Sequence, residues 1–232
     1  MKIDLFADGA NVQSMLEMNS EIHIRGFTTN PTLMRKAGIK NYKAFAQEIL
    51  SEIKEKPVSF EVFSDDFEEM KRQALEIASW ADNVNVKIPI TNTTGQLSGE
   101  VVTFLVDRQV TVNVTAIMTT NQMTRILRSF KTNSTGYLSI FAGRIADTGR
   151  DPIPYVKESL DKIQKYPNLK IIWASPRELL NVIQADSIGC HIITVDHSLL
   201  GKLKLLNKDL EAYSLETVTM FRDDALSSGF SL

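Results

Sequence analysis

The sequence predicts a (β/α)₈ barrel, a TIM barrel formed as a single domain over residues 1–232, with a helix at the C-terminal end. Short runs of β-branched or apolar residues alternate with longer amphipathic segments along the whole chain. There are eight such runs, and no Pro/Gly/Ser-rich or low-complexity segment marks a domain boundary. Eight βα units in a chain of this length favour a closed barrel over an open doubly wound sheet.

The expected strands follow one another at intervals that leave room for a helix. They are residues 2–8, 24–30, 58–64, 83–90, 110–117, 137–143, 170–175 and 190–196. Helices are expected at residues 41–56, 67–81 and 210–232, and the first two have helical periodicity in Phe45, Ile49 and Ile53 and in Met70, Ala74, Ile77 and Ala78. Pro57 is expected to end the first helix, and Asp65 or Asp66 to cap the second.

The composition is that of an ordinary globular protein, with 43% apolar and 23% charged residues. A net charge of -2 supplies no positive field to attract nucleic acid or anionic lipid, so neither partner is expected. The single cysteine, Cys190, excludes an intramolecular disulfide, and no ligand spacing indicates a metal site. Carboxylates at Asp4 and Asp8 argue against a signal peptide, and no segment is long and apolar enough to span a membrane. We therefore expect a cytoplasmic protein.

Alternation of side chains along a strand determines which residues face the barrel interior. In the fourth strand, Val84, Val86, Ile88 and Ile90 share one face, and Asn83, Asn85 and Lys87 share the other. The apolar face packs against helices, so Lys87 is expected to point into the barrel. The same reasoning places a polar cluster near the strand ends where barrel active sites are built, namely Asp8, Thr28, Asn30, Glu61, Lys87, Asn113 and Thr115.

An inward lysine beside carboxylates can serve as a nucleophile. Burial disfavours the ammonium form, which leaves a neutral fraction of Lys87 for attack on a carbonyl carbon. Glu61, held by Thr115, could activate a water, and Asp8 could exchange the proton of a substrate hydroxyl. Two alternatives remain open at this point: a lysine that reaches solvent, and a structural network of ion pairs.

A phosphate group could be held at the adjacent strand ends. Arg144 follows the sixth strand, and Ser175 and Arg177 follow the seventh, where barrels often bind a substrate phosphate. Guanidinium groups match phosphate oxygens in fork geometry, and a serine adds a hydroxyl donor. Each arginine taken alone could equally be a surface or salt-bridge residue, so the expectation rests on their shared placement.

Several of these segments resemble one known family. Gly26-Phe27-Thr28-Thr29-Asn30-Pro31-Thr32 resembles the transaldolase signature, and Val84-Asn85-Val86-Lys87-Ile88-Pro89-Ile90-Thr91 resembles the Schiff-base segment of the small transaldolases and fructose-6-phosphate aldolases. The segments at residues 58–62, 113–115, 141–145 and 174–177 follow in family order. The resemblance spans nearly the whole chain.

The resemblance implies a residue-by-residue assignment of the site. Lys87 would be the nucleophile, Asp8 a general acid and base, and Glu61 with Thr115 the pair that activates water. Substrate would be bound by Thr28, Asn30, Asn113, Ser139, Arg144, Ser175 and Arg177. No metal or other cofactor is implied, because the protonated imine serves as the electron sink. The resemblance also implies sugar-phosphate substrates, a role in the pentose phosphate pathway, and a homo-oligomer of five-fold rings or their pairs, in which the helix at 210–232 packs on a neighbouring subunit.

Two activities share this scaffold in the family. One transfers a dihydroxyacetone unit from fructose 6-phosphate or sedoheptulose 7-phosphate to an aldose phosphate, and the other releases free dihydroxyacetone. Where this chain has Glu61 and Phe141, the aldolase branch has a glutamine and a tyrosine. Both positions of this chain therefore resemble transaldolase more than aldolase. The segment at 92–96 and Pro176 depart from the family pattern and leave the acceptor sugar open. A catalytically silent barrel that binds a sugar phosphate is a further alternative.

Overall fold

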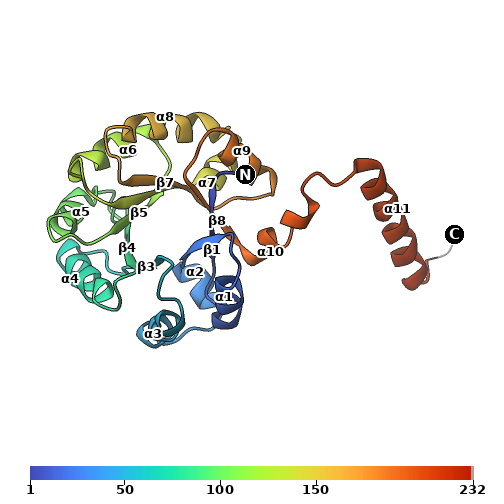
Figure 1. Ribbon diagram of the computed structural model, residues 1–232, viewed down its shortest axis with the longest axis horizontal. Coiled ribbons are helices and arrows are strands. Elements are labelled where there is room, and N and C mark those ends of the chain that lie inside the picture. Colours follow the sequence, from blue (N-terminus) through green and yellow to red (C-terminus); the bar gives the residue numbers. More distant parts are fainter. Residues whose placement is uncertain (231–232) are drawn as a thin grey trace. The chain divides into compact units, whose positions relative to one another are not determined.

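The computed structural model describes residues 1–230, and its first part is a closed barrel of eight parallel strands (Figure 1). Each strand pairs with the next in sequence order, and the eighth pairs with the first. The strands are β1 (Asp4–Asp8), β2 (Ile24–Thr28), β3 (Val58–Glu61), β4 (Val84–Pro89), β5 (Val112–Ile117), β6 (Gly136–Ile140), β7 (Leu169–Trp173) and β8 (Ile192–Asp196). The predicted (β/α)₈ barrel and all eight strands are therefore confirmed.

Five strands end earlier than the sequence predicted, namely β2, β3, β4, β6 and β7. β2 stops at Thr28 because Asn30 is already the N-cap of the next helix and Pro31 is its first residue. β3 stops at Glu61, since its pairing with β2 extends only to Ser59. The early ends of β2 and β3 free the chain to form the rim of a cavity.

Helices connect successive strands of the barrel and cover its outside, and a further helix, α11, belongs to the segment after the barrel (Figure 1). In the described chain they are α1 (Val12–Asn19), α2 (Pro31–Lys36), α3 (Tyr42–Glu52), α4 (Phe67–Ala78), α5 (Gly99–Val106), α6 (Thr120–Ile126), α7 (Ala142–Ala146), α8 (Ile153–Ile163), α9 (Leu180–Ser187), α10 (His197–Leu200) and α11 (Leu210–Ser227), with 3₁₀ turns η1 (Leu127–Ser129) and η2 (Leu203–Leu205).

The two helices predicted in detail form, with shorter C-terminal ends. α3 ends at Glu52, ahead of Pro57, because Ile53 already leaves helical geometry and acts as its C-cap. α4 ends at Ala78 with Ser79 as its C-cap. Its N-cap is Asp66, whose carboxylate accepts from the Glu69 amide at 2.9 Å.

The alternation predicted for the fourth strand is also confirmed. Val86 and Ile88 are fully buried on the face of β4 that packs against α4. Burial of such a side chain contributes roughly 1.5–3 kcal/mol. The opposite face carries Lys87 toward the partner strands of the barrel interior, where it meets Glu61 of β3.

An apolar cluster fills part of the barrel interior. Phe6 packs with Ile172, Ala174 and Ile192, and its ring occupies the space beside Gly26. A Cβ at Gly26 would lie only 2.6 Å from the Phe6 ring, so glycine is required there to admit the phenylalanine. Ala174 of this cluster also lines the cavity at the C-terminal ends of the strands, so the apolar cluster adjoins that cavity.

The chain forms two compact units, Met1–Leu199, which contains the whole barrel, and a second that begins at Leu200. The assignment of residues 1–232 to one domain stays a prediction. The second unit contains α11, whose N-cap Asp209 accepts from the Ala212 amide at 2.8 Å. The predicted terminal helix is confirmed for this range, and positions 231 and 232 lie outside the described residues. Over residues 1–230, no helix combines the length and the apolar character needed to cross a membrane.

Candidate active site

A cavity of about 390 Å³ opens at the C-terminal ends of the barrel strands. Nine of the eleven predicted site residues line it, namely Asp8, Thr28, Asn30, Glu61, Lys87, Thr115, Ser139, Arg144 and Ser175. A larger cavity of about 560 Å³ lies at the opposite end of β5 and β6 and contains none of them. The smaller cavity is therefore the candidate active site, because it contains the side chains that could carry out chemistry.

Lys87 lies at the floor of this cavity, with 6% of its surface exposed. Its Nζ donates to the Thr29 carbonyl oxygen at 2.7 Å and lies 3.2 Å from Glu61 Oε2. Glu61 is the register partner of Lys87 on the neighbouring strand, so the pair follows from the pairing of β3 with β4. The amine thus faces one carbonyl oxygen, one carboxylate and the open cavity.

Asp8 is the second carboxyl group of the cavity, at the end of β1. Its two oxygens accept from Thr28 Oγ1 at 2.9 Å and from Asn30 Nδ2 at 3.2 Å. Burial raises the pKa of the Asp8 carboxyl above its ordinary value, although the Lys87 charge and the Thr28 hydrogen bond oppose this shift. A carboxyl group with a raised pKa is suited to exchange protons during a reaction.

Thr115 points its hydroxyl into the same space from β5. The next residue, Ala116, has a φ of 62° in the left-handed region, where the register of β5 with β6 shifts. Among the described residues, the buried Thr115 Oγ1 has no hydrogen-bond partner. A buried hydroxyl of this kind is suited to bind a substrate oxygen or a water.

Asn113 does not line the cavity, because it is fully buried beneath it. Its amide Nδ2 donates to Ser59 Oγ at 3.2 Å, and its Oδ1 accepts from Ser139 Oγ at 2.8 Å. The side chain therefore joins three strands below the floor and supports Ser139, which does line the cavity.

Two of the three residues predicted to bind phosphate lie at one end of the cavity, which we call the phosphate end. Arg144 of α7 and Ser175 after β7 line the cavity, whereas Arg177 is not among its lining residues. Arg177 forms a two-point ion pair with Asp147, with Nε to Oδ1 at 2.9 Å, and its Nη1 donates to Ser175 Oγ at 3.1 Å. The hydrogen bonds from Arg177 lower the pKa of Asp147. In this arrangement Arg177 holds the Ser175 loop.

Close contact between two backbones shapes this end of the cavity. Ser175 has a φ of 59°, and its carbonyl oxygen lies against Gly143, where a Cβ would be 1.6 Å away. Only glycine fits at position 143, under that carbonyl group.

Sequence reasoning did not assign Thr194 or Tyr42 to the site, although the fold brings both of them there. Thr194 of β8 lines the cavity, and its hydroxyl lies 2.6 Å from that of Thr28. Strand alternation could have found it, because Thr194 lies between Ile193 and Val195, which are buried on the opposite face of β8. Tyr42, the first residue of α3, forms hydrogen bonds with the backbone of Glu61, and nothing in the sequence pattern indicates this contact.

Curated relatives match the chain along most of its length. A protein from Thermoanaerobacter sp. named "Probable transaldolase" is 33% identical over 229 residues, which cover 98% of this chain and 99% of the relative. A protein of the same name from Desulforamulus reducens is 35% identical over 213 residues, covering 90% and 94%. Relatives of this identity and coverage share both family and fold.

Solved structures with much lower identity share the architecture alone. One described as "Native KDPGal structure" has a TM-score of 0.58 at 12% identity and covers 84% of this chain and 83% of its own. Another, "Crystal structure of KGPDC from Streptococcus mutans", has a TM-score of 0.59 at 8% identity, with 85% and 89% covered.

The sequence profile of one family spans the barrel and α11. It is described as Transaldolase/Fructose-6-phosphate aldolase, and it matches residues 5–229. That range includes every residue of the cavity described above. The chain is therefore an aldolase-type enzyme that belongs to the transaldolase/fructose-6-phosphate aldolase family.

Proposed function

We propose that this protein is a transaldolase that transfers a dihydroxyacetone unit from a ketose phosphate to an aldose phosphate through a Schiff base on Lys87. The observation that carries the proposal is the position of Lys87, buried at the cavity floor with its Nζ 3.2 Å from a carboxylate. The name "Probable transaldolase" of the relatives supports it.

The first stage of the reaction is formation of the imine. The neutral Lys87 amine attacks the C2 carbonyl carbon of the ketose phosphate, and the carbinolamine then loses water to give a protonated imine. Glu61 lies beside the amine and can give and accept the protons of these steps. The free hydroxyl of Thr115 can hold the departing water.

Cleavage and transfer follow from the electron demand of the imine. A base removes the proton of the C4 hydroxyl, the C3–C4 bond breaks, and its electron pair moves into the imine to form an enamine. In this proposal Asp8, which lines the same cavity, takes that proton, and its raised pKa favours the protonated form that results. The fragment that begins at C4 leaves as an aldose phosphate, with C4 as its aldehyde carbon. The enamine then attacks the aldehyde of the acceptor, Asp8 returns the proton to the new hydroxyl, and water hydrolyses the imine to release the new ketose.

Two groups could bind the phosphate at the far side of the cavity. Arg144 supplies a positive charge and Ser175 a hydroxyl donor, and both line the cavity. Arg177 would contribute to phosphate binding indirectly, by holding Ser175. It would contact the phosphate itself only after leaving its ion pair with Asp147. Fructose 6-phosphate and sedoheptulose 7-phosphate both carry a terminal phosphate that could reach these groups.

The experiment is trapping of the imine with borohydride in the presence of fructose 6-phosphate, followed by peptide mass spectrometry. We expect a reduced adduct on Lys87 and loss of turnover in Lys87→Ala. Lys71→Ala is the matched control, because the Lys71 side chain is 14% exposed and paired with Glu68 and Glu100 outside the cavity. Absence of any adduct, or an adduct on another lysine, would refute the proposal.

A second assay separates transfer from simple aldol cleavage. Erythrose 4-phosphate is supplied as acceptor, and the yield of sedoheptulose 7-phosphate is compared with that of free dihydroxyacetone. Transfer should dominate in the wild type, and Glu61→Gln should shift activity toward release, because an amide cannot carry a proton as a carboxylate does. Release of dihydroxyacetone as the main product of the wild type would instead identify an aldolase.

We also propose that the protein is a homo-oligomer in which α11 contacts a second copy. The helix has no buried residue, and Leu215, Val218 and Phe221 are each at least 60% exposed. Removal of such apolar surface from water favours association. Light scattering should give a multiple of 26.0 kDa, and deletion of α11 should reduce it. A monomeric mass for the full chain would refute this proposal.

A further inference from the structure

Glu61, the last residue of β3, pairs with β4 but has no partner on its other side, where Ser59 pairs with β2. Ser59 pairs with β2, and its carbonyl oxygen accepts from the Thr29 amide at 3.2 Å. Glu61 points its backbone groups the same way, because residues two apart in a strand face the same neighbour. At that level β2 has already ended at Thr28. The Glu61 amide and carbonyl therefore need partners from elsewhere.

A single hydroxyl group supplies both partners. Tyr42 Oη accepts from the Glu61 amide nitrogen at 2.7 Å and donates to the Glu61 carbonyl oxygen at 3.1 Å. Tyr42 thus replaces the missing strand at the residue whose side chain faces Lys87.

Packing holds the Tyr42 ring in place. Tyr42 is the first residue of α3, whose N-cap Asn41 accepts from the Ala44 amide at 3.0 Å. The ring contacts Phe60 and Trp80 in edge geometry, with centroids 6.0 and 5.6 Å away. Burial raises the pKa of the Tyr42 hydroxyl, so it stays protonated and able to donate over the working pH range.

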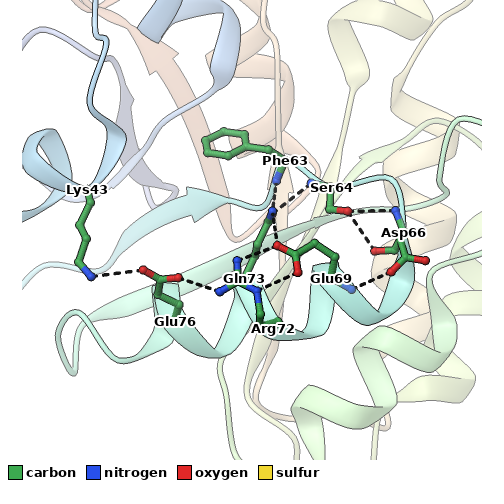
Figure 2. Close-up of polar contacts among 8 residues, drawn as sticks. All are labelled: Lys43, Phe63, Ser64, Asp66, Glu69, Arg72, Gln73 and Glu76. Carbon is green, nitrogen blue, oxygen red and sulfur yellow. Dashed lines mark hydrogen bonds and ion pairs between the residues drawn. The ribbon is translucent and has the colours of Figure 1, made fainter.

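The segment after Glu61 is held by a separate set of contacts, shown in Figure 2. Gln73 Oε1 accepts from the amides of Phe63 and Ser64 at 2.8 and 3.1 Å. Gln73 Nε2 donates to Glu69 Oε1 at 3.2 Å, and Glu69 is paired in turn with Arg72. These contacts hold the loop without touching Glu61. The backbone of Glu61 is therefore held by Tyr42 and not by this set of contacts.

We infer that Tyr42 is a positioning residue that sets the Glu61 carboxylate against Lys87. The inference rests on the proposed role of Glu61 and deepens it. The carboxylate must remain close to the amine to pass protons, and a misplacement of about 1 Å can cost on the order of 100-fold in rate. A backbone fixed through both of its polar groups limits such movement.

Tyr42→Phe removes the hydroxyl and keeps the ring. Transfer activity is measured from fructose 6-phosphate to erythrose 4-phosphate, with kcat and KM determined separately. We expect kcat to fall on the order of tenfold and KM to change less than about twofold, because proton transfer is affected more than substrate binding. Tyr166→Phe is the matched control, since its buried hydroxyl donates to the Leu127 carbonyl at 3.1 Å outside the cavity. An equal loss in both variants would overturn the inference.

A double-mutant cycle tests whether Tyr42 acts through the Glu61 side chain. Glu61→Ala keeps the backbone groups that Tyr42 binds but removes the carboxylate. Tyr42→Phe should therefore reduce the residual rate of Lys87 adduct formation less than about twofold in that background. A tenfold loss in both backgrounds would show that Tyr42 acts by another route and would overturn the inference.

Hydrogen exchange gives a readout that does not depend on activity. Tyr42→Phe should accelerate exchange in the peptide of residues 58–64, whereas Tyr166→Phe should leave that peptide unchanged. Unchanged exchange in Tyr42→Phe overturns the inference even if the enzyme is a transaldolase. Failure of the wild type to form a Lys87 adduct would refute the proposed function and, with it, the inference. Accelerated exchange in Tyr42→Phe would in that case still show that Tyr42 holds the Glu61 backbone.

Discussion

Replacement of Gly143 by alanine is expected to disable the phosphate end of the cavity. A Cβ at this position would lie 1.6 Å from the Ser175 carbonyl oxygen and 2.8 Å from its carbonyl carbon. Since Cβ atoms essentially never approach another heavy atom within 3.0 Å, the two segments would have to separate by about 1.4 Å. Both contacted atoms belong to the backbone, so rotation of a side chain cannot relieve the overlap.

The displacement acts on two groups at once. Arg144 follows Gly143 directly, and Ser175 carries the contacted carbonyl, and both line the cavity. Forcing one extra carbon into a packed site typically costs about 1–3 kcal/mol of stability. A shift of about 1 Å in substrate-positioning groups can lower the rate on the order of 100-fold. We therefore expect kcat/KM for fructose 6-phosphate to fall by about 10- to 100-fold.

The assay is steady-state transfer to erythrose 4-phosphate, combined with urea unfolding to confirm that the variant is folded. Gly9→Ala is the matched control, because its Cβ would lie 3.6 Å from Met15 Cγ, which is an ordinary contact. A Gly143→Ala variant with kcat/KM within twofold of the wild type would refute the reasoning. The reasoning would also be refuted if Gly9→Ala lost as much activity as Gly143→Ala.

Three further predictions concern buried and paired polar groups. Because the pKa of Asp8 is raised in the folded state, the stability it contributes is full below its ordinary value of 3.8 and is lost as pH rises through the raised value. Asp8→Asn should therefore gain stability relative to the wild type between pH 4 and pH 7 in thermal unfolding, and a pH-independent difference would contradict this. Asp147→Asn should free Arg177 from its ion pair and increase inhibition by inorganic phosphate several-fold, and unchanged inhibition would contradict the proposed role of this cavity end. Asn113→Ala should lower the free energy of unfolding by about 2–4 kcal/mol in urea titration, because two buried hydrogen bonds are lost. A loss below about 1 kcal/mol would show that the hydroxyls it leaves behind find other partners.

Much of the fold could be predicted because its signals are local. Alternation along β4 separates Val86 and Ile88 from Lys87, and that separation alone predicted the inward lysine. The ends of the strands were less predictable, since β3 stops at Glu61 only because β2 has turned away beside it. The outcome there depends on a neighbour that lies far away in the sequence.

By itself, the sequence determined the barrel, the inward face of β4 and the presence of an amine with two carboxylates near one rim. These follow from periods of two and 3.6 residues, which act between near neighbours along the chain. Only the tertiary structure decided that Arg177 pairs with Asp147, that Asn113 lies beneath the cavity floor and that Tyr42 holds Glu61. The physical reason is that hydrogen bonds require atoms within about 3 Å of each other, and such distances between remote segments are set by packing.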